Sequence, residues 1–297
     1  MSSEYRVIKS RDRMTNFPVN EKFTIGILDV STSQVLENSI NWYLDNMNIS
    51  IYVVTTNERL TANKLSTNYP NVTFICFSHV TSVGNMVNAL SSVCFSTYFF
   101  AVSSEAELIR FEGSPLLDCI EKDHNLIMIT PVFVNASGEI AESVNKPGFE
   151  DNLITTESHV FNLDDENAKN LFPFFGIGLY KRALFQRIKG YDELITSPYY
   201  QMLEFGIRCH LLSYNILTHS LLACSFRYKD HLEHDKTKDN GIKRCYTKAL
   251  CVKRVNDKNT TVKCKKNFDR KLYKEEIKKL QVKVQKTDFA TLIKEWN

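Results

Sequence analysis

The 297-residue sequence lacks several features, and each absence argues against a class of protein. No run approaches the roughly eighteen apolar residues of a membrane span, so we expect no transmembrane helix. The start of the chain carries charges and no apolar segment, which argues against a secretory signal. The eight cysteines include no Cys-x-x-Cys pair, and a reducing compartment is the plain interpretation. We therefore expect a cytoplasmic protein.

The net charge of +3 conceals two unlike parts of the chain. From Lys229 to the end, 20 basic side chains stand against 10 acidic ones, whereas the first 228 residues hold 17 basic and 24 acidic side chains. A hydrophobic content of 43% is enough for a large core. We therefore predict an N-terminal arm (1–20), one α/β domain (21–228) and a basic, mainly helical C-terminal extension (229–297).

Apolar segments with strand character alternate with segments of helical spacing along the first half of the domain. The strand segments are 23–28, 49–54, 72–77, 97–102 and 127–134, and the helical segments are 33–46, 60–68 and 85–95. This alternation predicts a doubly wound, mostly parallel α/β sheet. Residues 141–170 show weaker periodicity, and we expect them to be irregular or inserted.

Polar residues follow the first, second and fourth of these strands. Open α/β sheets bind ligands at the carboxyl ends of their strands, so chemistry is expected there. The three ends read Asp29-Val-Ser31-Thr32, Thr55-Thr56-Asn57-Glu58 and Ser103-Ser104-Glu105-Ala-Glu107. Their hydroxyl and carboxylate oxygens suit a nucleotide or a hard cation.

A second informative stretch runs from residue 172 to residue 216. An apolar segment with two glycines leads into a basic helix that stops at Gly190, whose missing Cβ permits a left-handed cap. Asp192 and Glu193 follow, and the next helix carries Glu204 and Arg208 four residues apart. Such an i,i+4 pair has a plain interpretation as a solvated salt bridge.

This arrangement resembles the acceptor-side half of family 2 glycosyltransferases. Lys189-Gly190-Tyr191-Asp192-Glu193 is similar to their Gly-Gly-Phe-Asp-Glu, and Glu204 with Arg208 fits their Glu-Asp-x-Asp-Leu-x-x-Arg helix. Asn88 lies fifteen residues before Ser103, as an Asn of that family lies before its first metal-site Asp. The resemblance covers about residues 22–227. It implies the GT-A fold of nucleotide-diphospho-sugar transferases and a nucleotide-diphosphate sugar as donor.

The resemblance also implies roles for individual side chains. It assigns nucleotide contacts to Asp29, Thr55, Thr56, Asn88 and Ser103. Where the family has a metal-binding Asp-x-Asp, this sequence has Ser103-Ser104-Glu105. A divalent cation, Mn²⁺ or Mg²⁺, is then assigned to Glu105, Glu107, His231 and His234. Plain alternatives stay open: the two glutamates begin a helix, Asn88 is a packing amide, and the histidines belong to an ordinary polar loop.

The catalytic base is where the sequence departs furthest from this family. Gln201 and Met202 stand where the family keeps an acidic pair, and neither side chain can take a proton. Glu204 and Asp192 are then the candidate catalytic carboxylates. Two functions stay open. One is sugar transfer from a nucleotide-diphosphate sugar to an unidentified acceptor, and the other is a catalytically inactive binding or structural protein on the same fold.

The basic extension contains one segment with a clear helical period. Its apolar residues are Leu272, Tyr273, Ile277, Leu280 and Val284. We expect an amphipathic helix that packs on the domain with its lysines outward. The alternative is an electrostatic surface for an anionic partner, such as nucleic acid or a membrane. Few aromatic residues accompany the lysines, which speaks against stacking on single strands.

Overall fold

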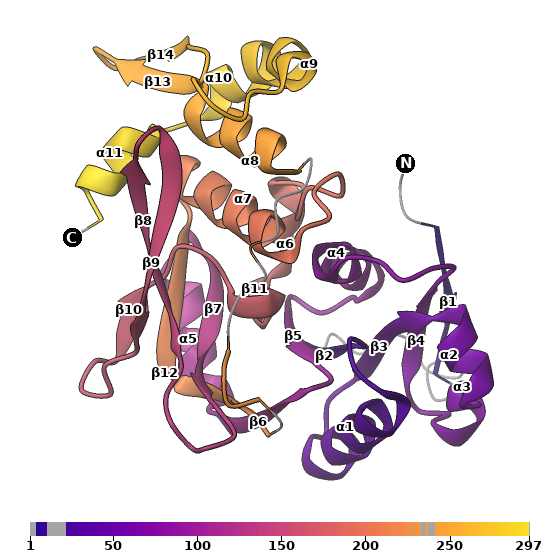
Figure 1. Ribbon diagram of the computed structural model, residues 1–297. Helices are drawn as coiled ribbons and strands as arrows, with labels where there is room; N and C mark the ends of the chain where they lie inside the picture. Colours follow the sequence, from indigo (N-terminus) through magenta and orange to yellow (C-terminus); the bar gives the residue numbers. More distant parts are fainter. Residues whose placement is uncertain (1–3, 11–21, 228, 233–235, 237–240, 297) are drawn as a thin grey trace.

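The computed structural model describes residues 4–10, 22–227, 229–232, 236 and 241–296. Its centre is a mixed, mostly parallel sheet with the strand order β1-β4-β3-β2-β5-β11-β7-β12-β10, flanked by helices (Figure 1). The predicted α/β class is confirmed. Within these residues, no helix is both long and apolar enough to cross a membrane.

The first half of the sheet has the doubly wound pattern expected from the sequence. Parallel pairing joins β4 to β3, β3 to β2 and β2 to β5, and β1 adds an antiparallel edge. The bounds are β1 Tyr5–Ile8, β2 Phe23–Leu28, β3 Ile51–Thr56, β4 Thr73–Phe77 and β5 Tyr98–Ser103. Because β3 and β5 lie on opposite sides of β2, the strand order reverses between β2 and β5. Open α/β sheets bind ligands at such a switch point.

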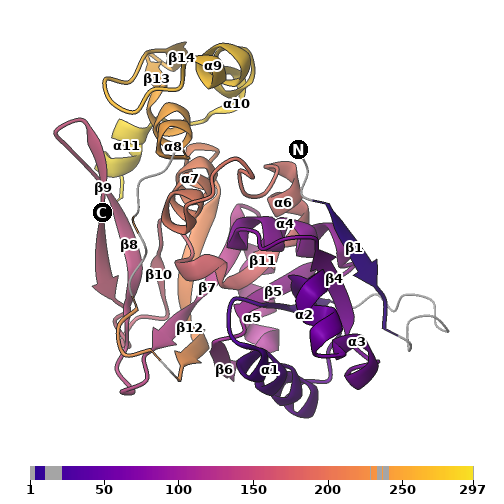
Figure 2. The ribbon, with the colours of Figure 1, turned by 45° about the vertical axis from the view of Figure 1, so that its right-hand side comes forward.

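Helices with one apolar face cover both sides of this half (Figure 2). α1 (Ser33–Asn46) buries Leu36, Ile40 and Tyr43 in the core on one side, and α4 (Val83–Val93) buries its own apolar face on the other. The helical period gathers each apolar set on one face. Two short helices connect β3 to β4, namely α2 (Asn57–Ala62) and α3 (Leu65–Asn68).

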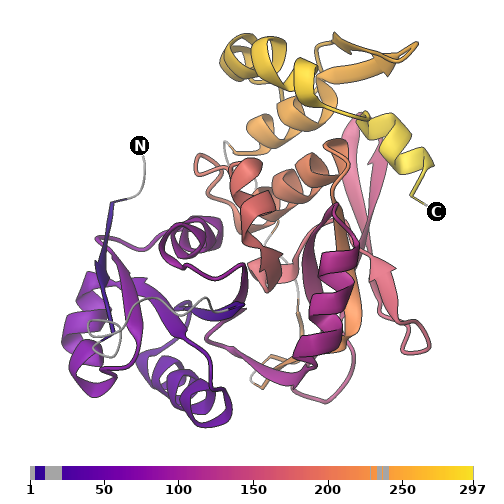
Figure 3. The ribbon, with the colours of Figure 1, turned by 180° about the vertical axis from the view of Figure 1, so that it is seen from behind.

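The chain direction changes in the second half of the sheet. β11 (Gly178–Lys181) is antiparallel to its neighbours β5 and β7 (Leu126–Val134), and β12 (Asn215–Phe226) is parallel to β7. β6 (Ala106–Phe111) and β10 (Asn167–Lys169) pair with β12 in the antiparallel sense. The helices of this half are α5 (Gly113–Lys122), α6 (Arg182–Arg187) and α7 (Pro198–Leu211). Figure 3 shows α5 on the face opposite to α7.

Most of residues 141–170 form strands, so the expectation of irregular structure was wrong. β8 (Glu142–Glu150) and β9 (Leu153–Val160) form an antiparallel hairpin beside the main sheet. Asn145 and Asn170 are both buried, and Oδ1 of Asn170 accepts from the backbone N–H of Asn145 (3.0 Å). Because buried positions here hold hydrogen-bonded amides, the sequence shows no hydrophobic period that would have revealed the strands.

The C-terminal extension covers one end of the domain with several helices and one hairpin (Figure 1). Its elements are α8 (Gly241–Leu250), β13 (Val252–Val255), β14 (Lys258–Thr261), α9 (Arg270–Leu272), the π-helix η3 (Tyr273–Gln281), α10 (Val282–Val284) and α11 (Phe289–Lys294). Both α8 and α11 pack against α7. The extension is therefore joined to the second half of the domain through α7.

The predicted amphipathic helix of the extension exists, with a different buried face. Tyr273 and Ile277 are buried as expected, whereas Leu280 and Val284 are 54% and 53% exposed. The π-helical winding of η3 places more residues in each turn than an α-helix does, so the packed side continues to Val282. The period of an ordinary α-helix predicted the wrong residues for the end of this face.

Candidate functional site

The ends of β2 and β5 lie side by side at the switch point. The backbone N–H of Ser104 donates to the carbonyl of Leu28 (2.9 Å), and the hydroxyls of Ser31 and Ser104 are 2.7 Å apart. Ser103 is buried, and its hydroxyl accepts from the backbone N–H of Glu105 (3.1 Å). Ser103 therefore shapes the turn after β5, while Ser31 and Ser104 provide the hydroxyl groups of this edge.

Asp29 follows β2 directly, and its side chain is only 3% exposed. Thr55 donates to Asp29 Oδ2 (2.5 Å), and Nε of Arg59 lies 3.1 Å from the same oxygen. Burial raises the pKa of Asp29, and the Thr55 hydroxyl and the Arg59 guanidinium oppose that rise. The other oxygen, Oδ1, has no hydrogen-bond partner among the described residues. An unpaired buried oxygen is costly, so a ligand donor would be favoured there.

Arg59 is a member of this edge that the sequence reasoning missed. Its Nη2 donates to the carbonyl of Ser31 (2.8 Å), and Nη1 donates to the hydroxyl of Ser33 (3.0 Å). Thr56 caps α2 by accepting from the backbone N–H of Arg59 (3.2 Å), so its hydroxyl has a structural use. The sequence did contain a signal for it: Arg59 is a basic residue four positions after Thr55, just beyond the end of a predicted strand.

Asn88 binds the backbone of Tyr191. Its Nδ2 donates to the Tyr191 carbonyl (2.9 Å), and its Oδ1 accepts from the Tyr191 N–H (2.8 Å). The preceding Gly190 has φ +56°, and an added Cβ would lie 2.2 Å from Asn88 Oδ1. The geometry thus matches the packing-amide alternative, and a nucleotide contact from Asn88 stays a prediction.

Glu105 and Glu107 lie in the turn after β5 and in β6, so they do not begin a helix. One carboxylate oxygen of Glu105 lies 2.5 Å from Nζ of Lys229. The carboxylate of Glu107 forms an ion pair with Arg227. Burial raises the pKa of Glu107, and Arg227 opposes that rise. Both acids of the expected metal site are therefore paired with basic residues at the end of β12.

The side chains at this edge do not fit a divalent cation. Mg²⁺ and Mn²⁺ require several oxygen or nitrogen ligands directed at one point. In the described part of the chain, no group of three His, Cys, Asp or Glu side chains could hold a metal ion. Ser103 carries no charge, His231 is exposed, and the predicted ligand His234 lies outside the described residues.

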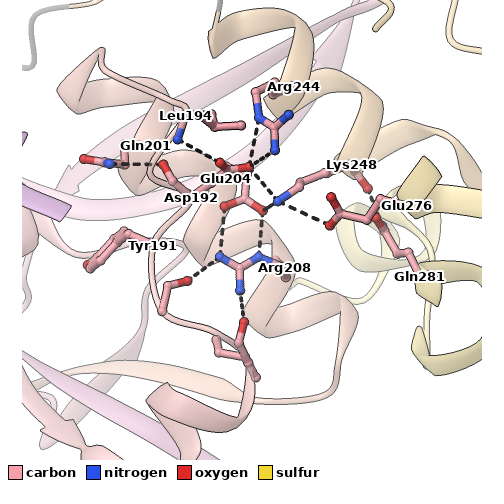
Figure 4. A network of polar contacts seen from close by, with 12 residues as sticks. Tyr191, Asp192, Leu194, Gln201, Glu204, Arg208, Arg244, Lys248, Glu276 and Gln281 are labelled. Carbon is pink, nitrogen blue, oxygen red and sulfur yellow. Dashed lines mark hydrogen bonds and ion pairs between the residues drawn. The ribbon is translucent and has the colours of Figure 1, made fainter. Parts of the chain in front are cut away.

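A buried ionic network occupies the acceptor side of the domain (Figure 4). Oδ2 of Asp192 lies 2.7 Å from both Nη2 of Arg244 and Nζ of Lys248. The two oxygens of Glu204 accept from Arg208 (2.6 and 3.0 Å), and Nζ of Lys248 lies 3.4 Å from Oε1. Arg244 and Lys248 belong to α8, so the extension supplies positive charge to both candidate catalytic acids.

The network keeps both carboxylates ionised. Burial acts to raise the pKa of Asp192, but Lys248 and Arg244 outweigh burial and hold this pKa well below its usual range. Burial likewise acts to raise the pKa of Glu204, and Arg208 and Lys248 lower it overall. A general base needs a reachable oxygen and a pKa near the working pH. In this arrangement neither acid meets that requirement.

Gln201 has a structural role at the position of the family's base. It is fully buried, and its Oε1 accepts from the backbone N–H of Gly84 (3.0 Å). Its Nε2 donates to the hydroxyl of Ser82 (3.0 Å) and to the carbonyl of Asp192 (3.2 Å). Met202 beside it is 1% exposed in the core. These two positions join α7 to the start of α4 and offer no base.

A cavity of about 500 Å³ lies apart from these residues, between the β8–β9 hairpin and the extension. Its walls include Phe149, Val252, Phe289 and Ile293. Because none of the strand-end residues lines it, we do not assign the nucleotide to this cavity.

The chain has a GT-A fold, the fold of the glycosyltransferase structures to which it is similar. It is similar to GalNAc-T7, solved with UDP, GalNAc and Mn²⁺, with a TM-score of 0.67 and 10% identity over 94% of this chain and 57% of that chain. This chain therefore spans little more than half the length of that relative. TarS of S. aureus aligns with a TM-score of 0.48 and 13% identity, over 76% of this chain and 38% of that chain. No protein-family model and no curated protein matches the sequence.

Proposed function

We propose that the protein binds a nucleotide-diphosphate sugar at the ends of β2, β3 and β5 without base-assisted sugar transfer. The observation that carries this proposal is the environment of Glu204, which is 1% exposed and has both oxygens bound by Arg208. Asp192, the other candidate base, is bound by two cations of α8. A binding protein on this fold needs the donor-side edge and does not need a free carboxylate on the acceptor side.

The donor-side edge supports a nucleotide as the ligand. Oδ1 of Asp29 is a buried acceptor without a partner among the described residues, so a ribose hydroxyl or a nucleobase N–H that reaches it displaces no existing hydrogen bond. Thr55 and Arg59 fix the orientation of this carboxylate through its other oxygen. The UDP in the similar GalNAc-T7 structure supports the same ligand class.

Thermal unfolding with UDP- and GDP-sugars tests the binding, and CMP-sugars, which carry a single phosphate, serve as a comparison. A nucleotide sugar at about one hundred times its dissociation constant should add about 2.7 kcal/mol of stability. Asp29→Ala should abolish this gain, measured against the variant's own stability without ligand. Asp118→Ala, at an exposed aspartate of α5, is the matched control and should keep the gain. A panel in which no nucleotide sugar stabilises the protein would refute the proposal.

Turnover is measured separately with the unmodified protein. We expect neither hydrolysis of the nucleotide sugar nor transfer to a broad set of acceptors, because Glu204 and Asp192 are held in ion pairs. Robust transfer that is lost in Glu204→Gln would overturn the inactive part of the proposal and favour an active glycosyltransferase. The binding part would survive that result.

The location and an anionic partner remain proposals. We place the protein in the cytoplasm, supported by eight cysteines that are all free thiols, six of them buried. Arg244 and Lys248 of the extension face internal acids, so part of its positive charge is already neutralised. An anionic partner for its other lysines stays a prediction, tested by salt-dependent retention on heparin.

A further inference from the structure

Two basic side chains lie at the carboxyl end of β12, beside the turn that follows β5. Arg227 pairs with Glu107, and Nζ of Lys229 lies 2.5 Å from Glu105. The neighbour of Glu105 in the turn is Ser104, whose hydroxyl contacts that of Ser31 after β2. The Lys229 ammonium is therefore at the same edge of the sheet as the proposed nucleotide site.

Lys229 is held through its backbone and its side chain. Its carbonyl accepts from the backbone N–H of Ala136 (3.0 Å), and the carbonyl of Asp230 accepts from Nδ2 of Asn135 (3.1 Å). Its ammonium lies 5.5 Å from the centre of the Phe175 ring, within the range of a cation–π contact. A cation positioned in advance loses little conformational freedom when it binds an anion.

Phe175 itself has an unusual backbone. Its φ of 50° and ψ of 24° lie in the left-handed region, which large residues seldom adopt. Strain of this kind persists where the surrounding structure fixes it, and it is frequent at ligand sites. Here the residue with the strained backbone, Phe175, is the one whose aromatic ring lies beside the Lys229 ammonium.

The bases of this cluster are more exposed than its acids, so the cluster suits an anion better than a metal ion. Glu105 and Glu107 are each paired with a base, so the two carboxylates do not offer a shared set of free oxygens. The side chains of Lys229 and Arg227 are 39% and 57% exposed, so each is accessible to a phosphate oxygen from solvent. Ammonium and guanidinium groups bind phosphate oxygens through charge-assisted hydrogen bonds.

We propose, on the premise that the proposed nucleotide binding is correct, that Lys229 and Arg227 bind the diphosphate and that binding needs no divalent cation. The diphosphate displaces Glu105 and Glu107 from their ion pairs as it binds. Glu105 is then a competitor of the ligand for Lys229, whereas the family resemblance makes it a metal ligand. The two assignments predict opposite effects of one substitution.

Calorimetric titration of the full chain with UDP and with uridine tests the proposal. UDP should bind equally well in EDTA and in Mn²⁺. Lys229→Gln should weaken UDP about tenfold or more, as loss of a charged hydrogen-bond donor does, and should leave uridine unchanged. Lys266→Gln, at an exposed lysine of the extension, is the matched control and should change neither ligand.

Glu105→Gln separates the two assignments. Removal of its charge frees Lys229, so UDP should bind more tightly in EDTA. If Glu105 is a metal ligand, the same variant should instead abolish Mn²⁺-dependent binding. Binding of UDP that requires Mn²⁺, or that Lys229→Gln does not weaken, would overturn the inference and leave the proposed function in place. If neither UDP nor GDP binds under any condition, and no nucleotide sugar stabilises the protein, the proposed function itself fails.

Discussion

Replacing Lys248 with methionine tests whether the acceptor-side network holds the extension on the domain. The Lys248 side chain is 10% exposed, and its Nζ lies 2.7 Å from Asp192, 3.4 Å from Glu204 and 3.6 Å from Glu276. Methionine keeps a long apolar stem and removes the charge. Lys248→Met therefore leaves three carboxylates facing two guanidinium groups.

The expected loss follows from the burial of these groups. Removing one partner of a buried ion pair costs roughly 3–5 kcal/mol, because the remaining charge is left uncompensated. We expect the lower end, about 3 kcal/mol, since Asp192 keeps Arg244 and Glu204 keeps Arg208. At about 2 °C or more per kcal/mol for a domain of this size, Tm should fall by roughly 6 °C or more.

Urea denaturation followed by tryptophan fluorescence is a suitable assay, because the two tryptophans report on different parts. The ring of Trp296 in the extension lies 4.9 Å from that of His210 in α7, whereas Trp42 lies in α1. The exposed control Lys266→Met should stay within about 0.5 kcal/mol of the unmodified protein. Adding Glu276→Gln to Lys248→Met removes one charge of each sign and keeps the Asp192–Arg244 and Glu204–Arg208 pairs, so it should restore part of the loss.

Dependence on pH provides a second check. The pKa values of Asp192 and Glu204 are lowered in the fold, so their contribution is present above about pH 4 and is lost as the pH falls. Burial acts to lower the pKa of Lys248, but Glu204 and Asp192 raise it overall, so its contribution is lost only above about pH 10. The effect of Lys248→Met should thus shrink in acid. A loss below about 1 kcal/mol at neutral pH, typical of exposed pairs, would refute the reasoning.

Two further predictions concern the packing around this network. Gly190→Ala should cost about 2 kcal/mol or more in urea denaturation, because φ is +56° and the new Cβ meets Asn88 Oδ1. Gly138→Ala, where φ is +83° and no atom lies within 4 Å, should cost only about 1 kcal/mol. Burial lowers the pKa of His210 to about 4, so stability should fall as the pH drops from about 6.5 to about 4. His210→Gln should flatten that slope; an unchanged slope would assign it to other groups.

The first half of the fold was predictable because its strands are buried on both faces. Such strands read as continuous apolar runs, and the predicted segment 23–28 coincides with β2 (Phe23–Leu28). The hairpin of β8 and β9 was not predictable in this way, since buried amides interrupt its apolar pattern. Local periodicity locates an element only where burial and hydrophobicity coincide.

The candidate site was predictable in part for a related reason. The topology of a parallel sheet brings strand ends together, and Asp29 and Thr55 do form a hydrogen bond. The spacing of Glu204 and Arg208 predicted their ion pair, but it did not indicate that α8 would bury it. Contacts between segments distant in the chain, such as Glu105 with Lys229, leave no local signal in a single sequence.

The positions at which the sequence departs from the family motifs are best understood together with the basic C-terminal extension. Buried ion pairs are weak evidence for stability, because apolar side chains of similar size often stabilise a fold equally well. The acceptor-side network instead fixes the position of α8 on α7. It does so because Arg244 and Lys248 of α8 form ion pairs with Asp192 and Glu204. On the donor side, Glu105 is likewise paired with a base at the end of β12. In both places the carboxylates that the family resemblance assigns to chemistry have basic partners from the end of β12 or beyond. We infer that the acidic body and the basic extension are complementary parts of one folded unit.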